Sequence, residues 1–392
     1  MMEYPGRQSF SSALTLGMML EHQMRQDPHF YFFSPDETTS NKLDQVYQTN
    51  ARAWNMPTKS WDLPESPDGR IVEMLSENVL FAAMVGHLMN GEQAMMASYE
   101  AFFNIITSQL IQHIKFLQQC DDVKWRPKLP AANLLSTSTC WRQDHNGFTH
   151  QAPVLISTLL NLPSHKSNCF FPVDDIAAAA TFNYMTTSTN VVNLTTFNKT
   201  AEPRWTTPDQ SLFQLQNGGV SVFDFISHPQ PDIIFTAAGD IASREALYAI
   251  KILNEDLPEA KIRFANINAL SYKAIGTTKH PLSQAEFDRH FTTDKLILGN
   301  FHGYPDALAN ILAEYTDKKR IRVHGFIDRG TTTTPFEMLS LNQASRYHLA
   351  MDVANQYGRT DLLIKYRDIL KQNRVHAHQF GTDLPLITDF QF

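Results

Sequence analysis

The stretch IIFTAAGDIASREALYAIKILN, residues 233–254, indicates the fold most clearly. Its first six residues, Ile233–Ala238, are mostly apolar and predict a buried strand. A glycine-aspartate turn follows, and Ser243–Asn254 has the spacing of a helix. The apolar run Ile262–Ile267 then predicts a second strand. A strand, a helix and a strand in this order form a parallel βαβ unit, so a layered α/β domain is expected here.

The same alternation extends over the rest of the chain. Upstream it predicts strands near 30–33, 71–75, 132–136 and 190–197, and helices that include Asn41–Trp54, Ser98–Gln119 and Asp175–Tyr184. Residues 200–230 are rich in Pro, Thr, Gln and Gly, which is typical of a linker. We therefore expect two three-layer α/β/α domains, at residues 1–205 and 231–392, joined by a linker at 206–230.

Composition excludes several classes of protein. The 392 residues include 33 Lys and Arg against 40 Asp and Glu, and the formal net charge of −7 argues against sequence-independent nucleic-acid binding. Three scattered cysteines without a CxxC pair predict neither a disulfide scaffold nor a thiolate zinc site. We expect no membrane span and no signal peptide, because no apolar run reaches 18 residues and no basic segment precedes an apolar one. A cytoplasmic protein is therefore expected.

The densest polar cluster is WRQDHNGFTHQ at residues 141–151. It follows a predicted strand and precedes a helix that begins near Pro153. Ligands of parallel sheets bind beyond the carboxyl ends of the strands, so its two histidines, arginine, aspartate and asparagine could supply an acid/base pair and anion donors. The alternative is a loop whose side chains bind their own backbone.

Two other polar segments leave a functional and a structural interpretation open. Glu77 lies at a strand-to-helix turn, where Ser76 could simply cap the helix and Glu77 could favour its positive end. In the segment 34–42, Ser40 and Lys42 could bind a phosphate together with backbone amides, or a capping box could explain the pattern.

Three motifs of the second half indicate structure as readily as chemistry. The turn at 239–241 lacks the glycine pattern of a phosphate loop. In FHGYP, residues 301–305, a strand end turns into a helix with proline in its first turn, and His302 is expected to be structural rather than a ligand. The hydroxyls of GTTTTPFEM, residues 330–338, could bind an anion or cap a helix.

Taken in order, these segments resemble phosphoketolase, a thiamine diphosphate enzyme. The resemblance reaches the last residues of the chain, but phosphoketolases are roughly twice as long. The chain is similar to their pyrimidine-binding middle domain and their C-terminal domain, both transketolase-like, and the N-terminal domain that holds diphosphate and Mg²⁺ is absent. The segments that carry the resemblance are SPDETTSNKL (34–43), RIVEMLSE (70–77), SYEAF (98–102), WRQDHNGFTHQ (141–151), FHGYP (301–305), VHGF (323–326), GTTTTPFEM (330–338), RYHLAMD (346–352) and GTDLP (381–385).

The resemblance implies roles for individual residues. Glu77 matches the buried glutamate that shares a proton with the cofactor's aminopyrimidine ring. Tyr99 and Phe102, expected one turn apart on a helix, match the aromatic pocket around that ring. The remaining matches are polar groups near the substrate, Asn146 and His150, and the groups that bind the sugar phosphate, Ser40, Lys42 and Lys199. No metal ligand is assigned to this chain.

The resemblance also implies an activity and partners. Phosphoketolases cleave xylulose 5-phosphate or fructose 6-phosphate with inorganic phosphate, giving acetyl phosphate and an aldose phosphate. Thiamine diphosphate and Mg²⁺ are the implied cofactors, and a homodimer with active sites between subunits is implied. The alternatives are a separately encoded subunit of a split enzyme and a non-catalytic paralogue that acts as a binding protein. Asn78 and Glu92, which stand where the family usually has His and a cation, motivate the last alternative. Lys42 stands where the family usually has Arg, which loses bidentate geometry at the phosphate site.

Overall fold

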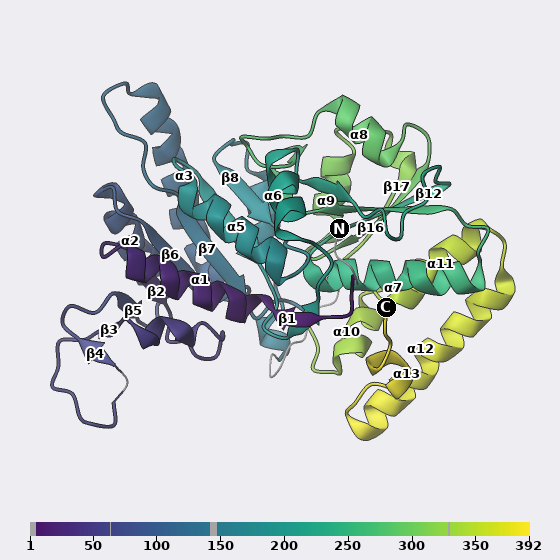
Figure 1. Ribbon diagram of the computed structural model, residues 1–392, viewed down its shortest axis with the longest axis horizontal. Helices are drawn as coiled ribbons and strands as arrows, with labels where there is room; N and C mark the ends of the chain where they lie inside the picture. The colour runs from purple at the N-terminus through teal and green to yellow at the C-terminus, as the bar shows by residue number, and fades with distance from the viewer. Residues whose placement is uncertain (1–4, 63, 142–146, 328–329) are drawn as a thin grey trace.

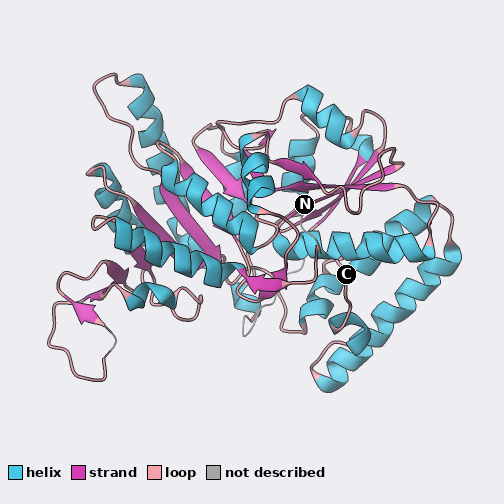
Figure 2. Cartoon of the chain, viewed as in Figure 1, coloured by secondary structure: helices cyan, strands magenta, loops and turns pink. Residues whose placement is uncertain are grey.

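Two β-sheets organise the chain. The computed structural model describes residues 5–62, 64–141, 147–327 and 330–392. A ten-stranded sheet is built mainly from the first half of the chain and a five-stranded sheet from the second half (Figure 1). Figure 2 shows helices on both sides of each group of strands, which confirms the expected α/β architecture.

The first sheet is parallel except at one edge. Strands β2 to β9 pair in parallel, whereas β14 and β15, which come from the second half of the chain, pair antiparallel. The strand order is β15-β14-β8-β9-β7-β6-β2-β5-β3-β4. Their bounds are β2 (Tyr31–Ser34), β3 (Arg52–Ala53), β4 (Glu65–Ser66), β5 (Ile71–Glu73), β6 (Ala94–Tyr99), β7 (Ala132–Thr137), β8 (Ser167–Phe170), β9 (Val192–Thr196), β14 (Ala269–Ser271) and β15 (Ala274–Ile275).

Helices cover both faces of this sheet, because successive side chains of a strand point to opposite faces. Met95 and Ala97 of β6 belong to the core under α1 and α5, whereas Ala94 and Met96 belong to the core under α2, α3 and α4. The elements are α1 (Ser12–Gln26), η1 (Asp44–Gln48), α2 (Glu77–Met89), η2 (Phe102–Ile106), α3 (Thr107–Asp122), η3 (Phe148–His150), α4 (Val154–Asn161) and α5 (Asp175–Thr187).

The second sheet has the same three-layer construction. Phe235 and Ala237 of β12 pack toward α7, α11 and α12, and Ile234 packs toward α8 and α9. The strand order is β11-β13-β12-β16-β17, with β11 antiparallel and the others parallel. Its elements are α6 (Pro208–Gln216), β11 (Val220–Val222), β12 (Ile233–Ala238), α7 (Asp240–Asp256), β13 (Ile262–Ile267), α8 (Gln284–Phe291), β16 (Leu296–Phe301), α9 (Pro305–Leu312), η4 (Lys318–Arg320), β17 (Ile321–His324), α10 (Pro335–Leu341), α11 (Arg346–Gln356), α12 (Thr360–Phe380) and α13 (Pro385–Thr388).

The two halves share structure. The segment 206–230 contains α6, which begins with a capping box between Thr207 and Gln210, and β11, which joins the second sheet. The β14–β15 hairpin leaves the second half and hydrogen-bonds to β8 of the first sheet. A small sheet of β1 (Ser9–Ser11) and β10 (Ala201–Pro203) ties the first described residues to the middle of the chain. The division into domains at 205 and 231 stays a prediction.

Two predicted helices are wrong. Ser98 and Tyr99 end strand β6, and the helix expected from Ser98 begins only at Thr107. A strand buried on both faces reads as a continuous apolar run, so AMMASY carries no alternation that would mark it as a strand. The helix expected at Asn41–Trp54 is a single 3₁₀ turn, η1, followed by the short strand β3. Among the described residues, no helix combines the length and the apolar character that crossing a membrane requires.

Candidate active site

The predicted site residues gather beyond the carboxyl ends of the parallel strands of the first sheet. Ser40 follows β2, Glu77 follows β5, Tyr99 ends β6 and Lys199 follows β9. The carboxyl ends of parallel strands meet at one edge of a sheet, which is where open α/β folds bind ligands. His150 enters the same place from η3.

Glu77 is the first residue of α2 and is buried, with 8% of its surface exposed. Its Oε1 accepts a hydrogen bond of 3.3 Å from the Ser98 hydroxyl. The Ser76 side chain makes no capping bond to the helix and donates instead to Oδ1 of Asn78 at 2.7 Å. The prediction that Ser76 caps this helix is therefore wrong. The Glu77 side chain is held by Ser98 of strand β6.

Three rings form an aromatic group next to Glu77. Tyr99 and Phe102 stack with their ring centres 5.7 Å apart and their planes 20° apart. The His150 ring lies 5.4 Å from Tyr99 and 5.1 Å from Phe102. Tyr99 and Phe102 do not lie one turn apart on a helix, as predicted, because Tyr99 ends a strand and Phe102 begins the 3₁₀ turn η2. A flat heteroaromatic ring fits beside such a pair.

Two lysines and a serine form the polar side of the site. The Lys199 ammonium lies 5.2 Å from the centre of the Tyr99 ring, and this side chain is only 4% exposed. Lys42 donates to the backbone oxygen of Lys199 at 2.9 Å, so the two residues are in contact. The hydroxyls of Ser40 and Tyr99 are 3.0 Å apart. This arrangement can bind an anion, with each lysine acting as a point charge.

His150 is the acid/base candidate that the structure describes. Burial and the nearby Lys199 charge lower its pKa, so the imidazole is neutral at pH 7. A neutral imidazole can both donate and accept a proton. The other candidate of this loop, Asn146, lies outside the described residues.

Sequence reasoning missed one residue of this site, Glu37. Its Oε2 accepts a 3.2 Å hydrogen bond from the Tyr99 N–H, which places a second carboxyl group near Glu77. The only sequence signal was its position in the polar run directly after strand β2.

Comparison with known proteins assigns the chain to a family. A family profile described as "D-xylulose 5-phosphate/D-fructose 6-phosphate phosphoketolase" matches residues 15–188, and a second, described as "XFP C-terminal domain", matches residues 199–392. The chain belongs to the phosphoketolase family. A probable phosphoketolase of Thermosynechococcus vestitus is 35% identical over 395 residues, which cover 97% of this chain and 48% of that protein. A probable phosphoketolase of Rhodopseudomonas palustris is 34% identical over 400 residues, or 99% of this chain and 51% of that protein.

The chain thus spans about half the length of the curated phosphoketolases that it matches. Solved structures confirm the transketolase-like fold. A transketolase from Pichia stipitis in complex with sedoheptulose 7-phosphate has a TM-score of 0.69 at 14% identity, over 90% of this chain and 46% of that one. A protein described as "Split gene transketolase, inactive beta4 tetramer" has a TM-score of 0.60 at 16% identity, over 90% of this chain and 99% of that one.

The donor set of this family member fits one end of thiamine diphosphate. The Glu77 carboxyl and the stacked Tyr99–Phe102 pair suit the polar edge and the flat faces of an aminopyrimidine ring. The described residues contain one cluster with metal-ligand chemistry, Glu100, Cys140 and His302, and it is fully buried. It offers no seat for a diphosphate-bound Mg²⁺.

That buried cluster joins the two sheets of the phosphoketolase fold. His302, directly after β16, bonds through Nε2 to Oε1 of Glu100 at 2.8 Å, and Oε2 of Glu100 accepts the Cys140 N–H at 2.6 Å. Cys140 Sγ and Trp141 Nε1 both donate to the backbone oxygen of His302. Burial alone would lower the pKa of His302, but Glu100 and Asp240 raise it. Each ligand atom already has a partner, which agrees with the structural role expected for His302.

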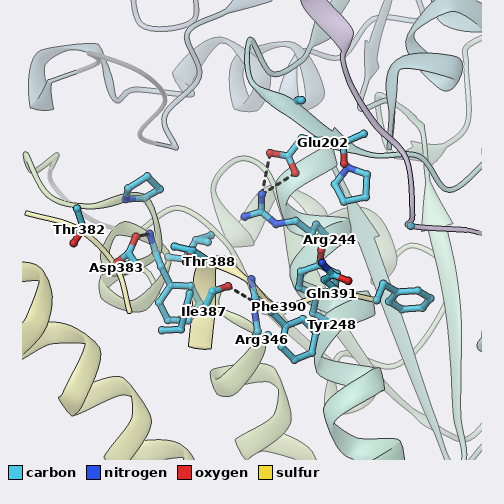
Figure 3. A pocket seen from close by; sticks show the side chains of 18 of the residues that line it. Glu202, Arg244, Tyr248, Arg346, Thr382, Asp383, Ile387, Thr388, Phe390 and Gln391 are labelled. Atoms are coloured by element: carbon cyan, nitrogen blue, oxygen red, sulfur yellow. Dashed lines mark hydrogen bonds and ion pairs between the residues drawn. The ribbon is translucent and has the colours of Figure 1, made fainter. Parts of the chain in front are cut away.

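A cavity of about 940 Å³ lies apart from this site (Figure 3). Figure 3 shows the Arg244 guanidinium facing Glu202, which it contacts at 2.9 and 2.7 Å. Arg346, the other labelled arginine, is bonded to Glu245. None of the predicted site residues that the structure describes lines this cavity. Glutamates therefore neutralise both of these arginines.

Proposed function

We propose that this chain is the catalytic C-terminal part of a phosphoketolase. The complete enzyme cleaves xylulose 5-phosphate or fructose 6-phosphate with inorganic phosphate, giving acetyl phosphate, an aldose phosphate and water. The observation that carries the proposal is the meeting of Glu77, the Tyr99–Phe102 pair and the two lysines at one sheet edge. Three buried cysteines without disulfide bonds suit the reducing cytoplasm that we propose as its compartment.

The described residues have separate tasks in this proposal. Glu77, Tyr99 and Phe102 hold the pyrimidine end of thiamine diphosphate, which when bound supplies the stabilisation of a carbanion. Glu77 holds or releases a proton at Oε1, where Ser98 fixes the carboxyl. Ser40, Lys42 and Lys199 bind the phosphate of the sugar, and neutral His150 moves a proton at the substrate. Asn146 keeps its proposed role beside the substrate.

The surroundings of Glu77 support a partner that completes the site. Four apolar side chains around the start of α2 and in η2 are exposed by 44–81%: Met74, Leu75, Val79 and Ile105. Such side chains beside a buried carboxyl suit a surface that another domain covers. We propose that the N-terminal domain binds here, carries the ligands of diphosphate and Mg²⁺, and belongs to a second subunit of a homodimer.

A separately encoded subunit is the second candidate. The split-gene transketolase supports it, because nearly the whole of that inactive chain has the fold of this one. The third candidate is a non-catalytic binding protein, and the position of Glu92 no longer supports it. Glu92 pairs with His29 and His87 beyond the far end of α2, so this departure does not alter the surroundings of Glu77.

Acetyl phosphate formation tests the proposal. The chain is joined to the N-terminal half of the Thermosynechococcus vestitus relative, and that relative's own second half on the same N-terminal half is the reference. With thiamine diphosphate, Mg²⁺, phosphate and xylulose 5-phosphate, we expect acetyl phosphate from the chimera and none from this chain alone. Glu77→Gln should lower the rate by roughly 10²–10⁴-fold, the range of acid/base catalysis. Exposed Glu255 provides the matched control, Glu255→Gln.

An inactive chimera beside an active reference would contradict the proposal and favour the binding protein. Acetyl phosphate from this chain alone would contradict its need for a partner.

A further inference from the structure

Glu37 carries a second carboxyl group of the candidate site, which the proposed chemistry does not use. It lies in the turn after β2, partly buried, whereas Glu77 follows β5. β2 pairs with β5 on one side and with β6 on the other, so both carboxyl groups lie next to the end of β6. Two consecutive residues of that strand hold them: the Ser98 hydroxyl donates to Glu77 and the Tyr99 N–H donates to Glu37.

Both negatively and positively charged side chains face Glu37. Glu77 on α2 repels its charge, and Lys199 after β9 attracts it. The Asn41 amide and the Tyr99 N–H also favour its ionised form. Lys42 donates to the backbone oxygen of Lys199, and Glu73 of β5 is bound by Arg52 and Thr38.

We propose that Glu37 is a positioning residue, held protonated beside Glu77 so that the two carboxyl groups carry a single negative charge between them. A neutral Glu37 leaves the charge of the pair on Glu77, the group that acts on the cofactor in the proposed function, on which this role rests. Its bond to the Tyr99 N–H also fixes the backbone that carries the aromatic ring. Two charged carboxylates in one partly desolvated site repel each other, which favours one shared proton.

Electrostatics support this arrangement. Burial raises the pKa of Glu37 to about 8; the Tyr99 N–H opposes the shift and Glu77 adds to it. Between the ordinary pKa of a glutamate and about pH 8, the folded chain keeps a proton that the unfolded chain has released. The stability of the folded chain therefore falls as pH rises through this interval, and a residue that cannot ionise removes the effect.

The first test compares Glu37→Gln with the wild type in this chain alone, without substrate or partner, by denaturant unfolding from pH 5 to pH 9. Glutamine keeps the oxygen that accepts the Tyr99 N–H and cannot lose a proton. We expect the unfolding equilibrium constant of the wild type to rise relative to that of Glu37→Gln by up to about tenfold per pH unit below pH 8. Glu255→Gln should follow the wild type. Parallel curves for Glu37→Gln and the wild type would overturn the proposal.

The second test reads the proton directly and does not require Glu37→Gln to fold. Infrared difference spectra of the wild type between pH 6 and pH 9 should contain the loss of a protonated-carboxyl band. In Glu77→Gln, which removes the repelling charge, we expect this band to be lost at lower pH. A titration that is the same in both proteins, or absent from the wild type, would refute the shared proton. Because neither test measures acetyl phosphate, failure here is distinct from failure of the proposed function.

Discussion

At the scale of the residue, Lys199 connects most parts of the candidate site. Its ammonium lies over the Tyr99 ring, its backbone oxygen accepts Lys42, and its charge acts on His150 and Glu37. A buried cation of this kind sets the protonation of its neighbours as well as binding an anion.

Lys199→Met tests this electrostatic role. Since Lys199 is one of the two causes that lower the pKa of His150, we expect the variant to raise that pKa toward the ordinary histidine value. The same change removes an attraction that favours ionised Glu37, so the pKa of Glu37 should rise further. NMR titration of His150 in the isolated chain measures the first shift. An unchanged or lowered pKa of His150 would show that burial alone determines its protonation.

At the same scale, the sequence identified most of the site but not its details. The structure brings together Glu77, Tyr99, Phe102, His150 and Lys199, because their motifs follow strands of one parallel sheet. Their roles stay a proposal. Glu37 was missed because nothing in a single sequence shows that two glutamates 40 positions apart will approach each other after β2 and β5 pair.

At the scale of the element, the end of β6 determines the geometry of the site. Ser98, Tyr99 and Glu100 bind, in turn, Glu77, Glu37 and His302. The predicted helix at this place would have directed these side chains differently. Periodicity cannot separate a short strand buried on both faces from part of a helix, so the error at Ser98 was not avoidable from pattern alone.

Glu100→Ala should strongly destabilise the fold. It leaves a buried histidine and the Cys140 N–H without their acceptor, and removing one partner of a buried pair costs about 3–5 kcal/mol. Denaturant unfolding of the isolated chain measures this loss, and Glu255→Ala, on the exposed surface, should change the free energy of unfolding by less than about 0.5 kcal/mol. A loss for Glu100→Ala as small as that of the control would mean that the buried cluster does not join the sheets.

The same cluster predicts a pH dependence. His302 has a raised pKa in the folded chain, so its contribution to stability is complete below the ordinary histidine pKa and is lost as pH rises through the raised value. The variant His302→Gln should lack this dependence in unfolding measured between pH 6 and pH 9.

At the scale of the whole molecule, we expect the two sheets to fold as one unit. One hydrophobic core contains residues from both halves, such as Leu155 and Ile156 of α4 with Leu308 and Ile311 of α9. The β14–β15 hairpin completes the first sheet with residues 269–275. The sequence predicted the order of strands and helices, but strands of two or three residues that pair across the molecule leave no periodic signal.

A fragment of residues 5–230 tests this unity. It lacks the hairpin at the edge of β8 and the helices that cover α4, so we expect it to unfold without a cooperative thermal transition and to bind a hydrophobic dye. The intact chain should unfold in one transition by calorimetry. A fragment with a cooperative transition of its own would show that the halves are independent domains.

We propose that this chain holds only the pyrimidine side of a shared site, and calorimetric titration with thiamine diphosphate and Mg²⁺ measures this directly. We expect no micromolar binding to the isolated chain. We expect binding once the chain is joined to a phosphoketolase N-terminal half, weakened by Glu77→Gln but not by Glu255→Gln. Micromolar binding by the isolated chain would contradict it.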